Sequence, residues 1–249
     1  MEGRPLIFLR LLLVLALLLV AGPALAAPAF DAASEATAGT GNLSWTHTPS
    51  GTPRGVKVYV SQDAAFSDQV SSVTYGGVGM TRIEFAARDG TEDGAVYLYF
   101  LGASIPTGAQ TVSVTVSDAA TKTAHAVTAT ASADTAVEDS SQTTGDAADP
   151  SLDVTTAGGL TTFCTSGAFS GVGAPSNLLE DTDMTRMNSH DFGVTITAWD
   201  RITTNPTGGT VNFSWTAVSN NFAIAAACIK EQAAAGAAAG GMLLLGVGR

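Results

Sequence analysis

The residues best suited to acid–base chemistry are the three histidines, His47, His125 and His190, because their ordinary pKa values lie closest to neutrality. No two of them stand at the short spacing that places paired histidines on one metal ion. The sequence has no G-x-S-x-G turn for a serine nucleophile, and Cys164 lacks flanking residues typical of a catalytic thiol. The sequence therefore predicts no catalytic residues and a protein that is not an enzyme.

Carboxylates form the second group with chemical potential, and the tightest set is Glu180, Asp181 and Asp183. On a strand, Asp181 and Asp183 would share one face and Glu180 would point to the other. Two carboxylates can act as a glycosidase pair, but the E-x-D-x-x-E spacing of sandwich glycosidases is absent. Calcium, which prefers oxygen ligands, is the cofactor that Asp181 and Asp183 would bind, with a solvated acidic strand end as the alternative. A second calcium candidate is the acidic segment that carries Asp146, Asp149 and Asp153.

The chain has two cysteines, Cys164 and Cys228, in separate predicted strands. Cys228 shares a strand face with Phe222 and Ile224 and is therefore expected to point inward. An exported protein can join such a pair in a disulfide if their Cα atoms lie within about 7 Å. Cysteine is also an ordinary small core residue, so the sequence leaves both interpretations open.

Aromatic residues could form a platform for stacking sugar rings, or they could fill a core. The candidates are Trp45, Trp199, Trp215, Tyr75, Tyr97 and Tyr99. Trp215 lies on the strand face of Val211 and Phe213, which favours a core position. Trp199 lies opposite Ile196 and Ala198, so we expect an exposed ring there and take Trp199 as the candidate ligand-binding residue.

Composition limits the class of protein and of partner. The chain has 249 residues, 45% of them hydrophobic, so it is too apolar for wholesale disorder. Its formal net charge of -11 argues against binding to nucleic acid, which needs clustered Lys and Arg. Two cysteines are too few for a disulfide-dense scaffold.

The two ends of the chain have the composition of targeting segments. Arg4 and Arg10 precede the apolar run of residues 11–21, and Ala24-Leu25-Ala26 follows it as a cleavage pattern, which predicts a helical signal peptide over residues 1–26. Residues 232–249 are rich in Ala and Gly, then apolar, and resemble the sorting tails of bacterial surface proteins; a flexible or weakly helical end is the alternative. We expect contact with a membrane only through these two segments.

Between these ends, the dominant pattern is the alternation of apolar and polar residues that is typical of β-strands. Val56, Val58 and Val60 alternate with Lys57, Tyr59 and Ser61, and Val112 and Val114 also have polar neighbours. One face of each such strand is expected to be packed and the other exposed. Residues 96–101 and 222–229 are apolar on both faces, which predicts central strands. We expect one sandwich domain over residues 42–231, a loosely attached lead-in over 27–41 and a surface loop over 138–149.

Two short sequence echoes connect the halves of this domain. Residues 42–46 (NLSWT) resemble 212–216 (NFSWT), and residues 106–112 (PTGAQTV) resemble 206–211 (PTGGTV). Strands and turns share such chemistry widely, and the echoes are too short to establish a duplicated domain.

Four segments carry a resemblance to a known family: residues 72–81, 96–101, 105–108 and 111–116. Their order resembles a β-sandwich module of secreted bacterial and phage-associated structural proteins, similar to the jelly-roll sandwiches of concanavalin A-like lectins. The resemblance extends over residues 30–231, and the closing strands at Trp215 and 222–230 fit it. It implies an all-β, two-layer antiparallel β-sandwich of jelly-roll type and a bacterial origin, with no catalytic residue to transfer.

These features predict a non-catalytic exported module, secreted or at the cell surface, that acts as a structural or adhesive protein. Its loops would contact a glycan or another protein at a cell or particle surface. Two alternatives remain: a calcium-dependent, lectin-like carbohydrate-binding protein, and a phage-derived structural component of a virion, for which a signal peptide would be unexpected.

Overall fold

The computed structural model describes residues 27–63, 68–88, 94–117, 119–130, 132–147, 149–156, 161–170, 179–180, 184–191, 196–202, 207–216 and 220–231. Every regular element in these ranges is a β-strand, and the pairing is antiparallel throughout, which confirms the all-β prediction. The signal peptide and tail predicted for residues 1–26 and 232–249 lie outside the described residues. Within the described part of the chain, no helix has the length and apolar character needed to span a membrane.

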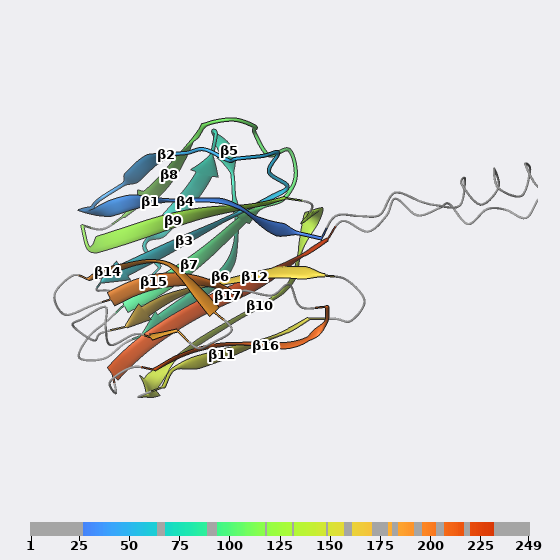
Figure 1. The fold of residues 1–249 in the computed structure, drawn as a ribbon. Helices are drawn as coiled ribbons and strands as arrows, with labels where there is room; N and C mark the ends of the chain where they lie inside the picture. The colour runs from blue at the N-terminus through green and yellow to red at the C-terminus, as the bar shows by residue number, and fades with distance from the viewer. Residues whose placement is uncertain are drawn as a thin grey trace, which may run out of the picture. The chain divides into compact units, whose positions relative to one another are not determined.

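The strands form four sheets, two from each half of the chain (Figure 1). The first inner sheet has the order β1-β9-β3-β7-β6 (Ala29–Thr40, Thr121–Thr130, Gly55–Asp63, Gly94–Leu101, Thr81–Arg88). The first outer sheet has the order β2-β8-β4-β5 (Leu43–His47, Gln110–Val116, Val70–Tyr75, Val78–Gly79). The second inner sheet has the order β10-β17-β12-β15-β14 (Ser132–Ala147, Asn220–Glu231, Thr162–Ser170, Ile196–Ile202, Met184–Asp191). The second outer sheet has the order β11-β16-β13 (Ser151–Thr156, Gly209–Thr216, Leu179–Glu180).

The strand order of the first half is repeated in the second half. Replacing β1, β9, β3, β7 and β6 by β10, β17, β12, β15 and β14 converts one inner sheet into the other, and β2-β8-β4 corresponds to β11-β16-β13. One sequence echo reflects this repeat, because Gly108 before β8 and Gly208 before β16 occupy equivalent turns with φ of 73° and 80°. The other echo does not, since it matches β2 to β16, which are not equivalent strands.

Three apolar layers hold the four sheets together. The first layer fills the space between the inner and outer sheets of the first repeat, and the second does the same in the second repeat. The third lies between the two inner sheets, where β7 and β9 contribute Leu98 and Val127 and β12 and β17 contribute Phe163 and Ile229. The sequence predicts a single two-layer sandwich over residues 42–231, whereas the strands form two such sandwiches, one in each repeat, joined by a further sheet-on-sheet contact.

This contact explains one prediction that was confirmed and one that was wrong. The strands that are apolar on both faces, β7 and β17, are in the inner sheets, as expected of central strands. In β3, by contrast, Lys57, Tyr59 and Ser61 were expected to face solvent, yet all three are buried. The alternation correctly identified two different faces, but the second inner sheet covers the face that the sequence marks as polar.

Two segments predicted as irregular are strands. The expected lead-in contains β1, which pairs with β9 along its length, and the expected acidic loop forms most of β10, which pairs with β17. Both strands lie at the edge of an inner sheet and pair with only one neighbouring strand. An edge strand can therefore carry small and polar side chains where a central strand carries apolar ones. Edge strands therefore carry a weak version of the apolar signal on which the sequence prediction depends.

Polar bonds cross the contact between the repeats at its centre. The Lys57 Nζ donates to the carbonyl oxygens of Phe163 (3.2 Å) and Ala227 (2.9 Å) and lies 5.1 Å from the centre of the Phe163 ring. The Tyr59 hydroxyl donates to the Thr165 carbonyl at 2.8 Å. Burial lowers the pKa of Lys57 well below its ordinary value of 10.5, because an ammonium group loses its hydration there.

Two glycines allow the inner sheets to approach each other. A Cβ atom at Gly94 would lie 1.9 Å from the Phe169 ring, and one at Gly167 would lie 2.5 Å from the Tyr59 ring. At the rim of the contact, Arg88 pairs with Asp146 at 2.6 Å. The packing of the Phe169 and Tyr59 rings on these glycines and the Arg88–Asp146 ion pair therefore favour one alignment of the two repeats.

Replacing Gly94 with alanine is expected to destabilise the protein by about 1–3 kcal/mol, the usual cost of overpacking a core. The Phe169 ring is fully buried and would have to shift to admit the added methyl group. Gly79→Ala is the matched control, because a Cβ atom there meets nothing within 4 Å. Guanidinium unfolding of both variants measures the difference, and equal midpoints would contradict the close packing described here.

Replacing Lys57 with methionine is expected to stabilise the protein at pH 7 by about 1–3 kcal/mol, since a buried amine without a carboxylate is replaced by an apolar side chain of similar length. Below pH 10.5 the amine of Lys57 is protonated in the unfolded chain, whereas burial disfavours its protonation in the folded chain. The free energy of unfolding of the wild type should therefore rise with pH up to about 10.5. This rise should be absent in Lys57→Met and retained in Tyr59→Phe, which loses a polar bond without changing the amine. Unfolding midpoints between pH 7 and 10.5 test both statements.

Candidate functional site

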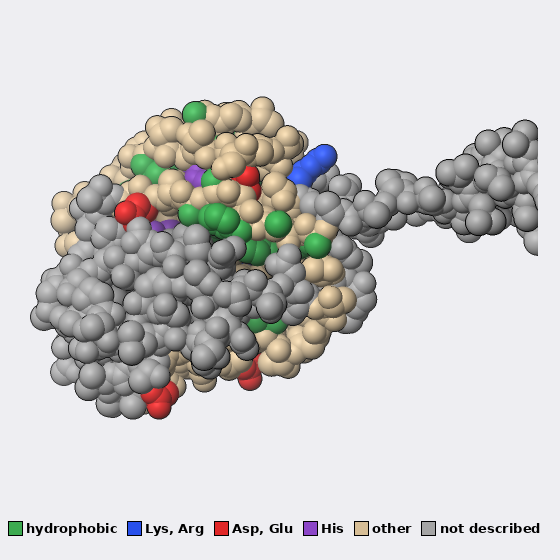
Figure 2. Space-filling view, viewed as in Figure 1, with side chains coloured by type: hydrophobic (Ala, Val, Ile, Leu, Met, Phe, Trp, Pro, Cys, Tyr) green, Lys and Arg blue, Asp and Glu red, His purple; other side chains and the backbone are tan. Residues whose placement is uncertain are grey.

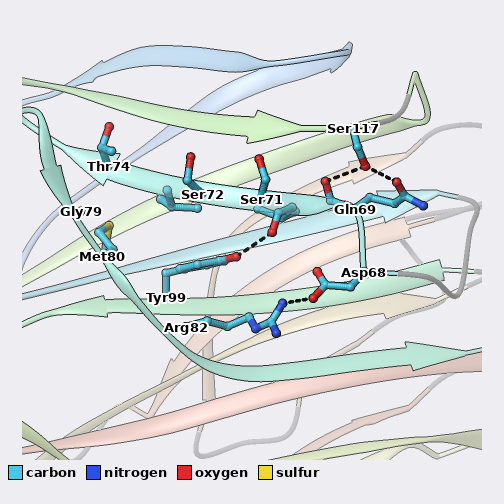
Figure 3. Close-up of a pocket in the computed structure, with 12 residues that line it drawn as sticks. Asp68, Gln69, Ser71, Ser72, Thr74, Gly79, Met80, Arg82, Tyr99 and Ser117 are labelled. Carbon is cyan, nitrogen blue, oxygen red and sulfur yellow. Dashed lines mark hydrogen bonds and ion pairs between the residues drawn. The ribbon is translucent and has the colours of Figure 1, made fainter.

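A groove of about 520 Å³ lies at one side of the first repeat (Figure 3). Its lining comes from the segment around β4, the start of β6, one residue of β7 and the end of β8: Asp68, Gln69, Val70, Ser71, Ser72, Val73, Thr74, Gly79, Met80, Arg82, Tyr99 and Ser117.

The groove exists because one stretch of chain crosses between sheets. β5 pairs with β4 only at Thr74 and Tyr75, and the Met80 backbone amide then donates to the Val73 carbonyl at 2.9 Å. From Thr81 the chain pairs with β7 in the inner sheet instead. The edge of β4 before Thr74 is therefore left beside a hollow.

The floor of the groove is apolar. Val70, Val73, Met80 and Tyr99 belong to the core between the inner and outer sheets and are at most 9% exposed. The Tyr99 hydroxyl donates to the Val70 carbonyl at 3.1 Å, and burial raises the pKa of Tyr99, so this donor stays protonated at neutral pH. A ligand entering the groove would meet methyl and thioether groups below and polar groups at the rim.

The rim carries an ion pair and several hydroxyl groups, which Figure 3 shows around the opening. Arg82 pairs with Asp68, and this hydrogen bond raises the pKa of Arg82. Both side chains are more than a third exposed, so the pair contributes little to stability and can exchange partners at low cost. Arg82 also lies over the Phe85 ring, 5.6 Å from its centre, which limits where the guanidinium can move.

A smaller cavity of about 280 Å³ lies at the turn between β7 and β8. Its lining includes Arg54, Thr107 and Ser104, and Ser104 has a positive φ of 55°. Positive φ is uncommon for a residue with a side chain, so the backbone of this turn has an unusual conformation at Ser104.

A second polar feature is a buried chain of hydrogen bonds centred on His47. The Trp45 indole donates to the Ser34 hydroxyl at 2.9 Å, and Ser34 lies 2.7 Å from His47 Nδ1. On the other side of the ring, His47 Nε2 lies 3.1 Å from the Thr128 hydroxyl, which donates to Asp31 at 2.9 Å. These five residues connect β1, β2 and β9.

The directions of these bonds determine the state of His47. A carboxylate only accepts, so Thr128 gives its single proton to Asp31 and must accept from the Nε2–H of His47. His47 Nδ1 then accepts from Ser34. Burial lowers the pKa of His47 from 6.5 to about 4, against the opposing effect of Asp31, so the ring is neutral at physiological pH.

Ser34, His47 and Asp31 look superficially like a nucleophile, a base and an acid. However, the Thr128 hydroxyl separates His47 from Asp31, and the Trp45 indole already occupies the Ser34 oxygen. A base with a pKa of about 4 also has little affinity for the serine proton. The arrangement therefore acts as a tie between strands.

The structure locates only some of the site residues predicted from sequence. Asp181 and Asp183, the calcium candidates, lie outside the described residues. Trp199 is in β15 opposite Gly167 and Asn188, but its side chain lies outside what the structure describes. In the second calcium candidate, Asp146 is paired with Arg88 and Asp153 accepts from Asn212 at 2.7 Å. Among the described residues, no group of three His, Cys, Asp or Glu could hold a metal ion.

The two cysteines form a disulfide between β12 and β17, with their Cα atoms 4.0 Å apart. They stand directly opposite each other in the ladder and face the core between the inner and outer sheets of the second repeat. Cys228 shares this face with Phe222 and Ile224, as the alternation indicated.

The other proposed aromatic platform residues are mostly core residues. Tyr75, Tyr97 and Trp215 are buried, and the Trp215 ring packs with Val211 and Phe213 as predicted. Trp45 is half-buried and donates its indole proton to Ser34.

Sequence reasoning did not find the groove. Its one local signal is the pair Ser71-Ser72, which interrupts the alternation between Val70 and Val73. In the structure this pair marks a β-bulge, where the register with β8 shifts between Val70 and Ser72. The other lining residues come from separate strands, whose proximity is a property of the folded chain.

Comparison with known proteins found no matching family model, no matching curated protein and no matching solved structure.

Replacing His47 with glutamine is expected to remove an acid-dependent loss of stability. The unfolded chain protonates His47 below pH 6.5, whereas the folded chain does so only near pH 4, so the wild type should lose about 3 kcal/mol as pH falls through this range. Above pH 6.5 this contribution is fully present. Subtracting the unfolding free energies of His47→Gln from those of the wild type between pH 7 and 4 isolates the effect, and a flat difference would contradict the neutral, buried ring.

Proposed function

We propose that the protein is a non-catalytic exported module that serves as a structural or adhesive component at a cell or particle surface. The observation that carries the proposal is the disulfide between Cys164 and Cys228, buried in an inner sheet. Disulfides persist in oxidising compartments and are rare in the cytosol, which agrees with the leader predicted for residues 1–26.

The disulfide also suits a protein that must stay folded outside the cell. It closes a loop between residues 64 positions apart, which in the chain-entropy account adds about 4 kcal/mol of stability. Together with the contact between the inner sheets, it makes the two repeats a firm support for the exposed groove.

The strand order supports the jelly-roll type for both repeats. In each repeat, the first four strands of the inner sheet (β1-β9-β3-β7, β10-β17-β12-β15) have the order of one jelly-roll sheet. They face β2-β8-β4 or β11-β16-β13, and the strand that would complete this outer sheet, β6 or β14, pairs at the edge of the inner sheet instead. This architecture is common in binding and capsid proteins and carries no chemistry by itself. It also favours the second candidate, a structural component of a virion.

The surface supports a role in contact with neutral partners. Figure 2 shows that charged side chains are few and scattered over the coloured part of the visible face. On the first outer sheet, the exposed positions of β2, β8 and β4 carry hydroxyl groups: Ser44, Thr46, Thr111, Thr115, Ser71 and Ser72. Such a face can form hydrogen bonds to a glycan or protein without the cost of desolvating charges.

Producing the full chain in a bacterial host tests this function. We expect the mature protein outside the cytoplasm, beginning near residue 27, with no free thiol after unfolding without reductant. The matched control lacks residues 1–26 and should remain in the cytoplasm. Cytoplasmic retention of the full chain with two free thiols would contradict export, and co-sedimentation with phage particles would favour the virion component.

A further inference from the structure

The tripeptide Asn42-Leu43-Ser44 at the start of β2 has the N-x-S form of an acceptor for N-linked glycosylation. So short a pattern also occurs by chance, and its surroundings in the fold decide whether it is usable. A usable acceptor presents the asparagine amide nitrogen and the hydroxyl group at the surface, on the same side of the chain.

The fold places the asparagine and the serine of this tripeptide on one exposed side. Leu43, which stands between them, is 7% exposed and packs in the core between the inner and outer sheets of the first repeat. Because successive side chains of an extended chain point to opposite faces, Asn42 and Ser44 are directed to solvent, and both are exposed. Among the described strands of the first outer sheet, β2 pairs only with β8, so the tripeptide lies at an open edge of that sheet.

The Asn42 side chain is held with its nitrogen available. The Val116 backbone amide donates to Asn42 Oδ1 at 2.9 Å, which fixes the orientation of the side-chain amide because only its oxygen can accept. Within the described part of the chain, no residue accepts a hydrogen bond from Asn42 Nδ2, and none bonds to the Ser44 hydroxyl. Both groups that define the acceptor are therefore accessible in the folded protein.

A second tripeptide of the same form, Asn212-Phe213-Ser214 in β16, has different surroundings. The Asn212 Nδ2 donates to the Asp153 carboxylate at 2.7 Å, so this nitrogen is directed along the sheet toward β11. Ser214 is half-buried. The Asn212 nitrogen is thus available only before β11 and β16 pair, whereas the Asn42 nitrogen stays available after folding.

We propose that Asn42 is the acceptor for an N-linked glycan, which an oligosaccharyltransferase of the export route transfers from a lipid-linked oligosaccharide. The bond between Nδ2 and the anomeric carbon forms as the bond from that carbon to the lipid diphosphate breaks. The diphosphate leaves with the bonding electrons, and the amide gives up one proton to a base of the transferase. The inference rests on the exported location in the proposed function, because the acceptor must reach the compartment in which this transferase acts.

The position gives the glycan a physical role. A bulky hydrophilic group beside the open edge of β2 hinders edge-to-edge pairing with another copy of the chain. Thr46 and Thr111, which stand opposite each other at the far end of β2, would remain uncovered for contact with a partner.

Secretion from a eukaryotic host tests the acceptor, once with residues 1–26 in place and once with the leader of the host instead. Enzymatic removal of an N-linked glycan in heavy-oxygen water converts the modified asparagine to a labelled aspartate, which peptide mass spectrometry locates. We expect the label at Asn42 in each secreted product, and a lower occupancy at Asn212.

Ser44→Ala removes the acceptor pattern but keeps Asn42 and its bond from Val116, so the glycan at Asn42 should be lost. Ser44→Thr keeps the pattern and should retain the glycan. Thr46→Ala is the matched control, because it removes an exposed hydroxyl of β2 that lies outside the tripeptide, and it should leave the occupancy of Asn42 unchanged.

A secreted chain without a glycan on Asn42, a Ser44→Ala variant that keeps it, or a higher occupancy at Asn212 than at Asn42 would each overturn the inference. The product made with the leader of the host gives this result even where residues 1–26 fail to direct export. Failure of those residues therefore counts against the proposed function alone.

Discussion

A β-sheet that is covered on both faces must satisfy its backbone hydrogen bonds within its own ladders and must carry side chains that tolerate burial on either side. Both inner sheets of this protein are under that constraint, because each packs against an outer sheet on one face and against the other inner sheet on the opposite face. Strand β7 meets it along its whole length, and β17 meets it with the apolar run of residues 222–229. Strand β3 meets it differently, by directing Lys57 and Tyr59 to main-chain carbonyls of the facing sheet.

The polar groups in this contact specify how the repeats fit together more than they stabilise it. An apolar layer between two sheets can slide, because the hydrophobic effect has no direction. Lys57 has acceptors only where Phe163 and Ala227 present their carbonyl oxygens, and Tyr59 fits only above Gly167. Buried polar groups often trade stability for a single arrangement in this way.

The groove follows from the same architecture. The first outer sheet packs against the core with one face only. The chain leaves this sheet after the two residues of β5 and continues in the inner sheet as β6. The departure opens the side of the sandwich and brings core residues such as Val73 and Met80 to the bottom of a surface groove. The disulfide and the contact between the inner sheets constrain the rest of the repeats, so the groove is carried by a firm support.

The amino-acid sequence alone determined the all-β class, the inward faces of most strands and the central positions of β7 and β17, because alternation and local apolar runs record which side of a strand is buried. It could not show what covers the other side. Lys57 and Tyr59 look like solvent-facing residues until the second repeat is placed against them, and β1 and β10 look irregular until β9 and β17 supply their partners. The groove and the disulfide likewise depend on distances between residues far apart in the chain, such as Asp68 and Arg82 or Cys164 and Cys228. Local pattern reports the environment of one strand at a time, whereas pairing between distant strands and packing between the repeats are long-range properties that only the tertiary structure decides.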